Sequence, residues 1–218
     1  MKKKRTPRIA PLRRDAVETR TRLLSEAGHA FAEFGYDGVG LRDICKAAEV
    51  NLGAVKYYFG SKQELYREAL IQPHIQLLQE ESVPSFDGST DPEGALLNWL
   101  NFALRTVLVR RREHPYLSRL FIREFANPSF AMEELIELVF KKVRHELVRI
   151  VMALKHKDQE DSQVAELANM VILLCVQQEV GRPVLERLAY PPPTKDQDVR
   201  ALAERIHRFV LAGIKASA

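Results

Sequence analysis

The stretch LRDICKAAEVNLGAVKYYF, residues 41–59, contains two short helical patterns separated by a break of three residues. Apolar side chains recur at helical spacing in residues 41–48, Glu49-Val50-Asn51 interrupts the pattern, and residues 52–59 resume it. Two short helices joined by a three-residue turn form a helix-turn-helix, whose second helix lies in the major groove of DNA. The stretch therefore predicts a DNA-reading unit.

The outward side of the second short helix carries small and polar residues. Gly53 and Ala54 allow close approach to base edges, and Lys56 and Tyr57 can reach guanine, phosphate or sugar. Amides at the helix start after Ser61 favour phosphate. The predicted DNA contacts are Leu41, Arg42, Asn51, Leu52, Gly53, Ala54, Lys56, Tyr57, Tyr58 and Lys62. The alternative is a three-helix scaffold that binds nothing.

A reading helix needs a rigid core beneath it. The predicted core residues are Phe31, Phe34, Ile44, Ala48, Val50, Val55 and Phe59. One helix is expected over residues 15–34, ended by Gly35, and another over residues 61–81, opened by a Ser61–Glu64 capping box. Pro73 lies inside the latter and predicts a kink or a break.

The charge is unevenly distributed along the chain. The 218 residues have a net charge of +4, and the positive excess lies in the first third, much of it in the tail MKKKRTPRIAPLRR. A basic end on a neutral body favours a polyanionic partner, nucleic acid first and an anionic membrane second. The alternative is a solvated, disordered tail that aids solubility.

Residues 19–70 resemble the DNA-binding domain of the tetracycline-repressor (TetR/AcrR) family. Three motifs carry the resemblance: Phe34-Gly35-Tyr36, Arg42-Asp43-Ile44 and Tyr57-Tyr58-Phe59-Gly60-Ser61-Lys62. The resemblance implies about nine helices, a homodimer and a ligand pocket in the C-terminal part. Glu49 stands where the family usually has Gly, and a positive φ there would cost about 1 kcal/mol. Gly40 replaces the usual Thr or Ser, so one hydroxyl contact to phosphate is in doubt.

Helical periodicity continues to the C-terminus without strand-like alternation. We expect an all-α fold of about nine helices, the later ones over residues 92–112, 115–126, from the 127–129 break to 154, 162–181 and 195–215. The expected parts are a basic disordered tail (1–14), a helix-turn-helix domain (15–70) and a regulatory ligand-binding and dimerisation domain (71–218).

Aromatic residues of the middle helices predict a ligand cavity. The segment HPYLSRLFIREFANP, residues 114–128, resembles regulators of the CecR type, which respond to small, often drug-like compounds. The predicted ligand contacts are Trp99, Phe102, Phe121, Arg123, Phe125 and His145, with Phe130, Arg119, Glu124 and His114 as further candidates. The alternative is ordinary core packing, with Arg123 paired to Glu124 or Glu146.

The helix expected over residues 162–181 is apolar on nearly all sides, which indicates neighbours on two sides. We expect it to join the last helix in a four-helix dimer interface. The predicted interface residues are Leu167, Val171, Leu174, Ile206, Phe209 and Val210. The alternative is a helix buried within one subunit.

Several other classes of protein are disfavoured. Two cysteines build neither a disulfide framework nor a four-ligand zinc site, and the six histidines lack metal spacing. We therefore expect no metal and no cofactor. No catalytic constellation or nucleotide fingerprint is present, so we expect no enzyme. The run 170–176 is too short to span a bilayer, and the cytoplasm is the expected compartment.

Together these patterns predict a repressor that binds a palindromic operator as a homodimer and leaves it when a small molecule binds. Ligand binding between the fourth and seventh helices would swing the fourth helix and change the spacing of the reading helices. One alternative is an enzyme that carries a three-helix module. Another is a structural DNA binder without a ligand, which predicts a filled core.

Overall fold

The computed structural model describes residues 10–88, 91–110, 114 and 116–217, and within these ranges every regular element is a helix. Counting the continuous run α7–η2–α8 once, the described residues form ten helices, against about nine expected. The elements are α1 (Ala10–Phe34), α2 (Leu41–Ala47), α3 (Leu52–Tyr58), α4 (Lys62–Glu80), α5 (Pro92–Leu108), α6 (Leu117–Ala126), α7 (Met132–Leu135), the π-helix η2 (Ile136–Phe140), α8 (Lys141–Leu154), α9 (Ser162–Val180), α10 (Arg182–Arg187) and α11 (Asp196–Ala216).

Local sequence explains where the helices begin. The Asn51 side chain accepts a bond from the Ala54 amide at 3.1 Å, and Ser61 Oγ accepts one from the Glu64 amide at 3.1 Å. Asp91 and Asp161 cap α5 and α9 in the same way. These side chains satisfy amides that the first turn of a helix leaves unpaired.

Three features of the helices differ from the sequence expectation. α1 begins at Ala10, so residues 10–14 are helical rather than part of a disordered tail, whereas residues 1–9 lie outside the described part. α4 continues through Pro73 without a break, because buried side chains such as Leu70 and Leu77 hold the helix on both sides of it. α10 is an additional helix after Gly181, where only an end or a kink was expected.

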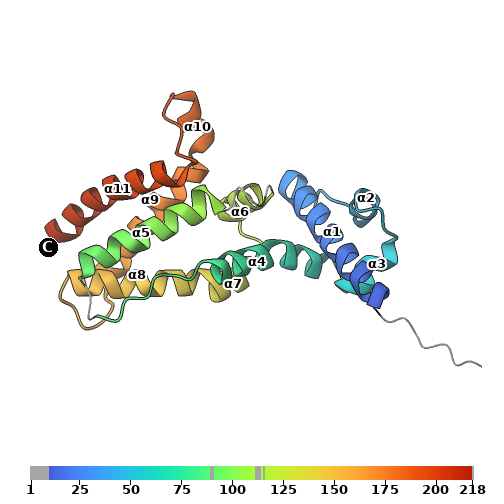
Figure 1. Cartoon of the computed structure of the whole chain (residues 1–218), viewed down its shortest axis with the longest axis horizontal. Helices are drawn as coiled ribbons and strands as arrows, with labels where there is room; N and C mark the ends of the chain where they lie inside the picture. The colour runs from blue at the N-terminus through green and yellow to red at the C-terminus, as the bar shows by residue number, and fades with distance from the viewer. Residues whose placement is uncertain (1–9, 89–90, 111–113, 115, 218) are drawn as a thin grey trace, which may run out of the picture.

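The molecule is elongated, with α1–α3 at one end and α5, α8, α9 and α11 packed together at the other (Figure 1). α4 runs from the first group into the second. Two apolar cores correspond to these groups. The first core extends beyond residue 70, since it includes Ile71 and Leu77 of α4 and Leu117 and Leu120 of α6.

Candidate functional site

The outer face of α3 is exposed as the sequence predicts. Tyr57 is 80% exposed and Leu52 48% exposed, and Asn51, Gly53 and Lys56 are also exposed. Ala54 is half-buried at the edge of the same face. The inner face is anchored by Val55, which is 2% exposed. The helix therefore presents polar and small side chains outward on a fixed base.

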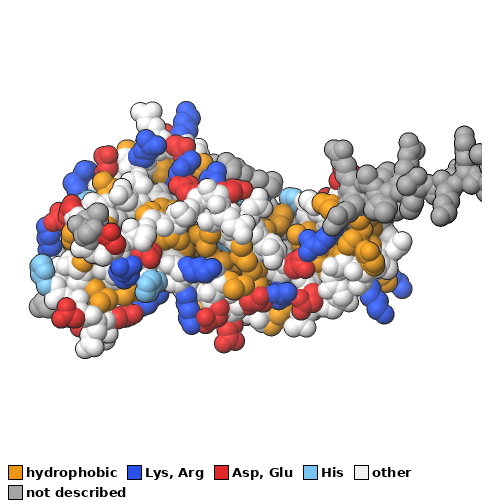
Figure 2. All heavy atoms as spheres, turned by 60° about the horizontal axis from the view of Figure 1, so that its bottom comes forward, with side chains coloured by type: hydrophobic (Ala, Val, Ile, Leu, Met, Phe, Trp, Pro, Cys, Tyr) orange, Lys and Arg blue, Asp and Glu red, His pale blue; other side chains and the backbone are white. Residues whose placement is uncertain are grey.

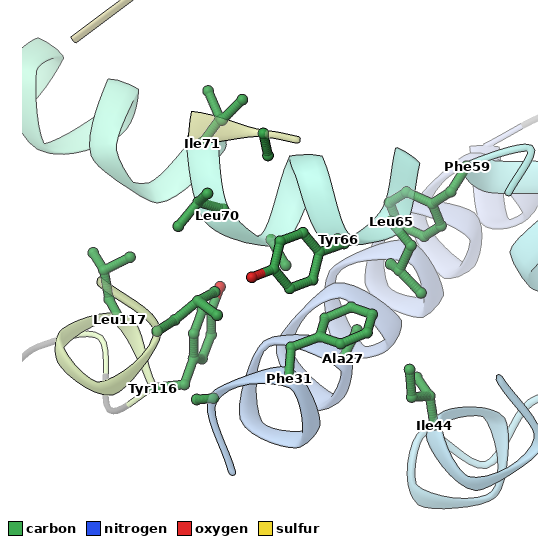
Figure 3. Close-up of a cluster of buried hydrophobic side chains, with 14 of the residues drawn as sticks. Ala27, Phe31, Ile44, Phe59, Leu65, Tyr66, Leu70, Ile71, Tyr116 and Leu117 are labelled. Carbon is green, nitrogen blue, oxygen red and sulfur yellow. The ribbon is translucent and has the colours of Figure 1, made fainter. Parts of the chain in front are cut away.

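A tightly packed core fixes the orientation of α3. Side chains from α1, α2, α4 and the start of α6 converge around Phe31 and Tyr66 (Figure 3). Phe31, Ile44 and Val55 are buried as predicted, and Phe59 is 6% exposed. Phe34, predicted to join them, is instead 62% exposed at the last residue of α1.

Two further contacts tie the reading unit to α1. Arg22 Nε donates to the carbonyl of Ala48 at 2.8 Å, directly before the turn. The Arg20 guanidinium lies 4.8 Å from the centre of the Phe59 ring and pairs with Glu68 of α4. The start of the turn and the C-terminal end of α3 are thus held from the same helix.

The remaining predicted DNA contacts surround α3. Arg42 is exposed on α2, and Leu41 and Tyr58 are half-buried. The Lys62 ammonium lies 4.5 Å from the centre of the Tyr36 ring, a cation–π contact that holds this cation at the start of α4. All ten predicted residues therefore belong to α2, α3, the preceding turn or the first residue of α4.

Both departures from the family pattern have structural consequences. Glu49 adopts φ 54°, the left-handed region that costs a residue with a side chain about 1 kcal/mol. Gly40 occupies the cap position of α2, where no side-chain hydrogen bond is formed. The turn therefore carries strain at Glu49 and lacks a capping hydroxyl at Gly40.

A cavity of about 220 Å³ lies among the helices that follow the DNA-reading unit. Helices α4, α5, α6, α8 and α9 and the π-helix η2 all contribute to its wall. The lining residues are His74, Leu77, Leu78, Trp99, Phe102, Ala103, Thr106, Val107, Phe121, Phe125, Ile136, Val139, Phe140, Lys141, Val143, Arg144, Ile172, Cys175 and Val176. Hydrophobic side chains gather across the middle of the face that carries α4 and α7, with charged side chains beside them (Figure 2).

Four of the six predicted ligand contacts line this cavity: Trp99, Phe102, Phe121 and Phe125. Arg123 and His145 do not line it. Arg123 is exposed and lies against Gly35 at the end of α1, and His145 is exposed on α8. Successive residues of a helix point in different directions, so neighbours of a lining residue face elsewhere.

The other candidates for polar or aromatic groups in the pocket also lie outside the cavity wall. Arg119 pairs with Glu33 of α1, Glu124 is buried between helices, and Phe130 packs against Tyr36 and Tyr66. His114 is half-buried but does not line the cavity.

His74 is a cavity residue that the sequence reasoning missed. It is 3% exposed, and its Nδ1 lies 2.7 Å from the carbonyl oxygen of Leu70. Because a carbonyl only accepts, Nδ1 carries the proton and donates that bond. Its helical spacing from Leu70 and Leu77 was a usable signal, since all three lie on the inner side of α4.

Cys175 of α9 also lines the cavity. This residue is 1% exposed, and burial raises the pKa of its thiol to about 12. A thiol in such surroundings stays protonated and behaves as a small apolar side chain.

A π-helical segment shapes one side of the cavity. η2 interrupts the α-helical hydrogen bonding between α7 and α8, and Ile136, Val139 and Phe140 from it line the cavity. An i→i+5 turn changes which side chains point inward, and such segments are frequent at functional sites.

α6 connects the cavity with the DNA-reading unit. Phe121 and Phe125 face the cavity, whereas Glu124 is 1% exposed and points toward α4. Its carboxylate accepts bonds from the Tyr66 hydroxyl, from Ser129 N at 3.1 Å and from Ser129 Oγ at 3.0 Å. Burial and the neighbouring Glu124 raise the pKa of Tyr66, which therefore remains a proton donor.

α6 also packs directly against α1. The Tyr116 ring lies so close to Gly28 that a β-carbon there would overlap it, and His29 contacts the same ring edge-on with centroids 5.3 Å apart. Gly28 therefore permits the close approach of the two segments. The cavity helix α6 is therefore in direct contact with the domain that carries α3.

The predicted dimer residues divide into two groups. Val171 and Val210 are 2% and 6% exposed and belong to the core of one subunit, which corrects their assignment to an interface. Leu167, Leu174 and Ile206 are half-buried and pack against that core, and Phe209 is 72% exposed. Met170 and Leu173, each 51% exposed, form the outward apolar side of α9, which the sequence reasoning did not single out.

In the described ranges, no group of three or more His, Cys, Asp or Glu side chains is placed to hold a metal ion. The same part of the chain contains no helix of the length and apolarity needed to cross a bilayer.

The chain matches two protein families over consecutive segments. Residues 23–69 match the family described as bacterial regulatory proteins, tetR family. Residues 98–214 match the C-terminal domain of the HTH-type transcriptional dual regulator CecR. The second match alone covers more than half of the 218 residues.

Individual relatives agree with these matches. The HTH-type transcriptional regulator AcrR of Shigella flexneri is 30% identical over 111 residues, 50% of this chain and 51% of AcrR. RutR of Escherichia coli (strain K12) is 32% identical over 114 residues, 52% of this chain and 51% of RutR. The chain thus spans about half the length of the curated relatives it matches.

A solved structure shares the fold over nearly the whole chain. The transcriptional regulator FadR of Bacillus subtilis, in complex with stearoyl-CoA, superimposes with a TM-score of 0.63 at 16% identity, covering 88% of this chain and 98% of FadR. An exposed reading helix on a packed core, the all-helical fold and both family matches agree. The chain therefore belongs to the TetR family of bacterial transcriptional regulators, with a C-terminal domain of the CecR type.

Proposed function

We propose that this protein is a homodimeric transcriptional repressor that binds a palindromic operator through α3 and releases it when a lipophilic small molecule enters the cavity. The observation that carries the proposal is the position of α6. This helix lines the cavity with Phe121 and Phe125 and contacts the DNA-binding domain through Tyr116 and Glu124.

The DNA-binding part of the proposal is supported by the surface of α3. Lys56 and Tyr57 project from a helix whose other side is buried, so the packed core holds the backbone that carries them. Lys56 can contact a base or a phosphate, and the Tyr57 hydroxyl can donate to a phosphate. In a dimer the two copies of α3 would occupy successive major grooves, roughly 34–36 Å apart.

Dimerisation is supported by exposed apolar residues on α9 and α11, two helices that both pack against α5. Met170 and Leu173 of α9 and Phe209 of α11 are each more than half exposed. Contact with another subunit would remove these large apolar side chains from water. Burial of these side chains in a dimer would contribute favourable free energy, which a monomer that leaves them in water does not gain.

Ligand-dependent release follows from the shared helices. A molecule that fills the cavity pushes against Phe121 of α6 and against Leu77 and His74 of α4. Both helices belong to the core of the DNA-binding domain, so their displacement changes the spacing of the two α3 helices. The stearoyl-CoA bound to FadR, which shares the fold, supports a lipophilic occupant. The cavity argues against a structural DNA binder without a ligand, for which a filled core was expected.

Binding to DNA from the protein's own upstream intergenic region, compared with a random duplex at several salt concentrations, tests the proposal. We expect selective, salt-dependent binding by a dimer. Lys56→Ala should weaken binding by about 1–3 kcal/mol if it reads a base, and Lys142→Ala, which removes an equivalent charge from α8, should not. Equal, weak binding to both duplexes would contradict operator recognition.

A further inference from the structure

We propose that the cavity selects amphipathic anions, with the apolar body inside and the anionic group at the rim beside Lys141 and Arg144. This inference rests on the proposed function in taking the cavity as a ligand site, and it adds the chemical class of the ligand. It follows from which charged side chains line the cavity and which do not.

The wall accepts an apolar body. Five aromatic rings line it, and the aliphatic side chains of α4, α5, η2, α8 and α9 fill the spaces between them. Burial of an apolar ligand surface in such a wall supplies the main favourable free energy of binding. The aromatic residues are Trp99, Phe102, Phe121, Phe125 and Phe140.

The charged side chains of the wall are both cations. They are Lys141 and Arg144, and no Asp or Glu lines the cavity among the described residues. A ligand cation would meet positive charge there, whereas a ligand anion would find donors. The sign of the lining charge therefore favours an anion.

Lys141 and Arg144 lie together at the rim. They are three residues apart in α8, which places them on one side of the helix. Their side chains are 62% and 32% exposed, so their stems reach the apolar wall while their charged ends remain near water. A carboxylate held between them would be partly desolvated, and Arg can bind it through two parallel hydrogen bonds.

The present partners of these cations can be exchanged for a ligand. Lys141 pairs with Glu137 and Arg144 with Glu160, and neither carboxylate lines the cavity. Arg144 Nε is also 3.3 Å from Asn169 Oδ1, a long contact. Ion pairs this exposed contribute little to stability, so replacement of Glu137 or Glu160 by a ligand anion costs little.

Trp99 provides a direct measurement because it is the only tryptophan of the chain and lines the cavity. Its fluorescence can be titrated with decanoate, decanol and decyltrimethylammonium, which share a decyl-length chain and differ in head-group charge. If Lys141 and Arg144 did not contact the ligand, decanol would bind more tightly than decanoate, because a carboxylate loses more hydration free energy than a hydroxyl on leaving water. We expect decanoate to bind more tightly than decanol, and decyltrimethylammonium to bind most weakly.

The double variant Lys141→Gln/Arg144→Gln should reverse the order of decanoate and decanol, with a loss of roughly tenfold in decanoate affinity. The matched control Lys142→Gln/Arg149→Gln removes the same charges from the same helix, but neither residue lines the cavity. It should leave the order unchanged. Lys141→Glu/Arg144→Glu should instead favour decyltrimethylammonium over decanoate.

Tighter binding of decanol than decanoate to the unmodified protein would overturn the proposal. So would absence of saturable decanoate binding, or an equal loss of decanoate affinity in both double variants. These titrations contain no DNA, so their failure is distinguishable from failure of operator binding. Thermal unfolding of each variant without ligand confirms that all are compared in the folded state.

Discussion

The two ends of the molecule are packed differently. Around Phe31 in the DNA-binding domain, side chains from several helices fill the core, whereas around Phe121 the helices leave a cavity of about 220 Å³. A reading helix needs a fixed base, because a small displacement misplaces its side chains relative to base edges. A ligand site needs unfilled volume, which lowers local stability until a ligand replaces the missing contacts.

The largest expected effect tests this difference in packing. Phe31→Ala should destabilise the protein by about 3–5 kcal/mol, because it opens a void in a filled core. Phe121→Ala should cost less, since one side of that ring already faces the cavity. Urea unfolding gives both values.

Phe34→Ala serves as the control for these two variants. Phe34 is 62% exposed, so its truncation should change stability by no more than about 0.5 kcal/mol. A cost for Phe121→Ala equal to that for Phe31→Ala would contradict the difference between a filled and a hollow core.

The second prediction concerns the link between the two regions. Tyr66→Phe removes the donor from the buried Glu124 carboxylate and leaves it with the two bonds from Ser129. We expect a cost of about 1–3 kcal/mol in urea unfolding. Tyr57→Phe, at an exposed position, should leave stability unchanged. An equal effect of the two substitutions would mean that the Tyr66–Glu124 bond does not stabilise the junction.

A third prediction compares one cysteine from each region at alkaline pH. Burial raises the folded-state pKa of Cys175 to about 12, whereas a thiol exposed to water in the unfolded chain has its ordinary pKa of 9.0. The folded state favours the protonated thiol. Its contribution to the free energy of unfolding is therefore fully present below pH 9.0 and is lost as the pH rises from 9.0 toward about 12. The loss should be about 1.4 kcal/mol for each pH unit within this window.

The measurement is urea unfolding on both sides of pH 9.0 for the unmodified protein and for Cys175→Ala. The variant should lose less stability on alkalinisation. Cys45→Ala in the DNA-binding domain should show a smaller difference of the same sign, since burial raises the pKa of Cys45 as well but less strongly. Identical pH dependence in all three proteins would refute the assignment to Cys175.

The smallest effect is expected in the turn before α3. Glu49→Gly should stabilise the protein by up to about 1 kcal/mol, because glycine adopts φ 54° without steric cost. Glu49→Ala removes the charge but keeps a β-carbon, and it should bring no such gain. Thermal unfolding of the two variants separates backbone strain from charge, and an equal gain in both would assign the effect to the charge.

The sequence predicted the DNA-binding half in most of its details. The residues that define α2, the turn and α3 are local in the chain, and their capping and spacing follow from neighbours a few positions away. The exposed face of α3 and the family could therefore be inferred from residues 19–70, and the all-α fold from the helical periodicity of the whole chain. Phe34 was the exception, because it is the last residue of α1 and stays exposed there, although its spacing from Phe31 is helical.

The C-terminal half was predicted less completely. Aromatic residues on the middle helices indicated a cavity, but their neighbours Arg123 and His145 face elsewhere. The cavity wall combines residues that are far apart in the sequence, such as His74 of α4 and Arg144 of α8, which are separated by 70 positions. Only packing brings them, with Lys141, to one wall. Val171 and Val210 are apolar, as interface residues often are, and only the fold shows that they are buried within their own subunit.

The sequence by itself determined the helices, their caps and the DNA-reading unit, because these depend on interactions between residues close in the chain. Only the tertiary structure decided the shape and charge of the cavity, the side of α9 that stays exposed, and the contact of α6 with both regions. Those features depend on how helices distant in sequence rotate and pack against one another, which periodicity leaves undetermined.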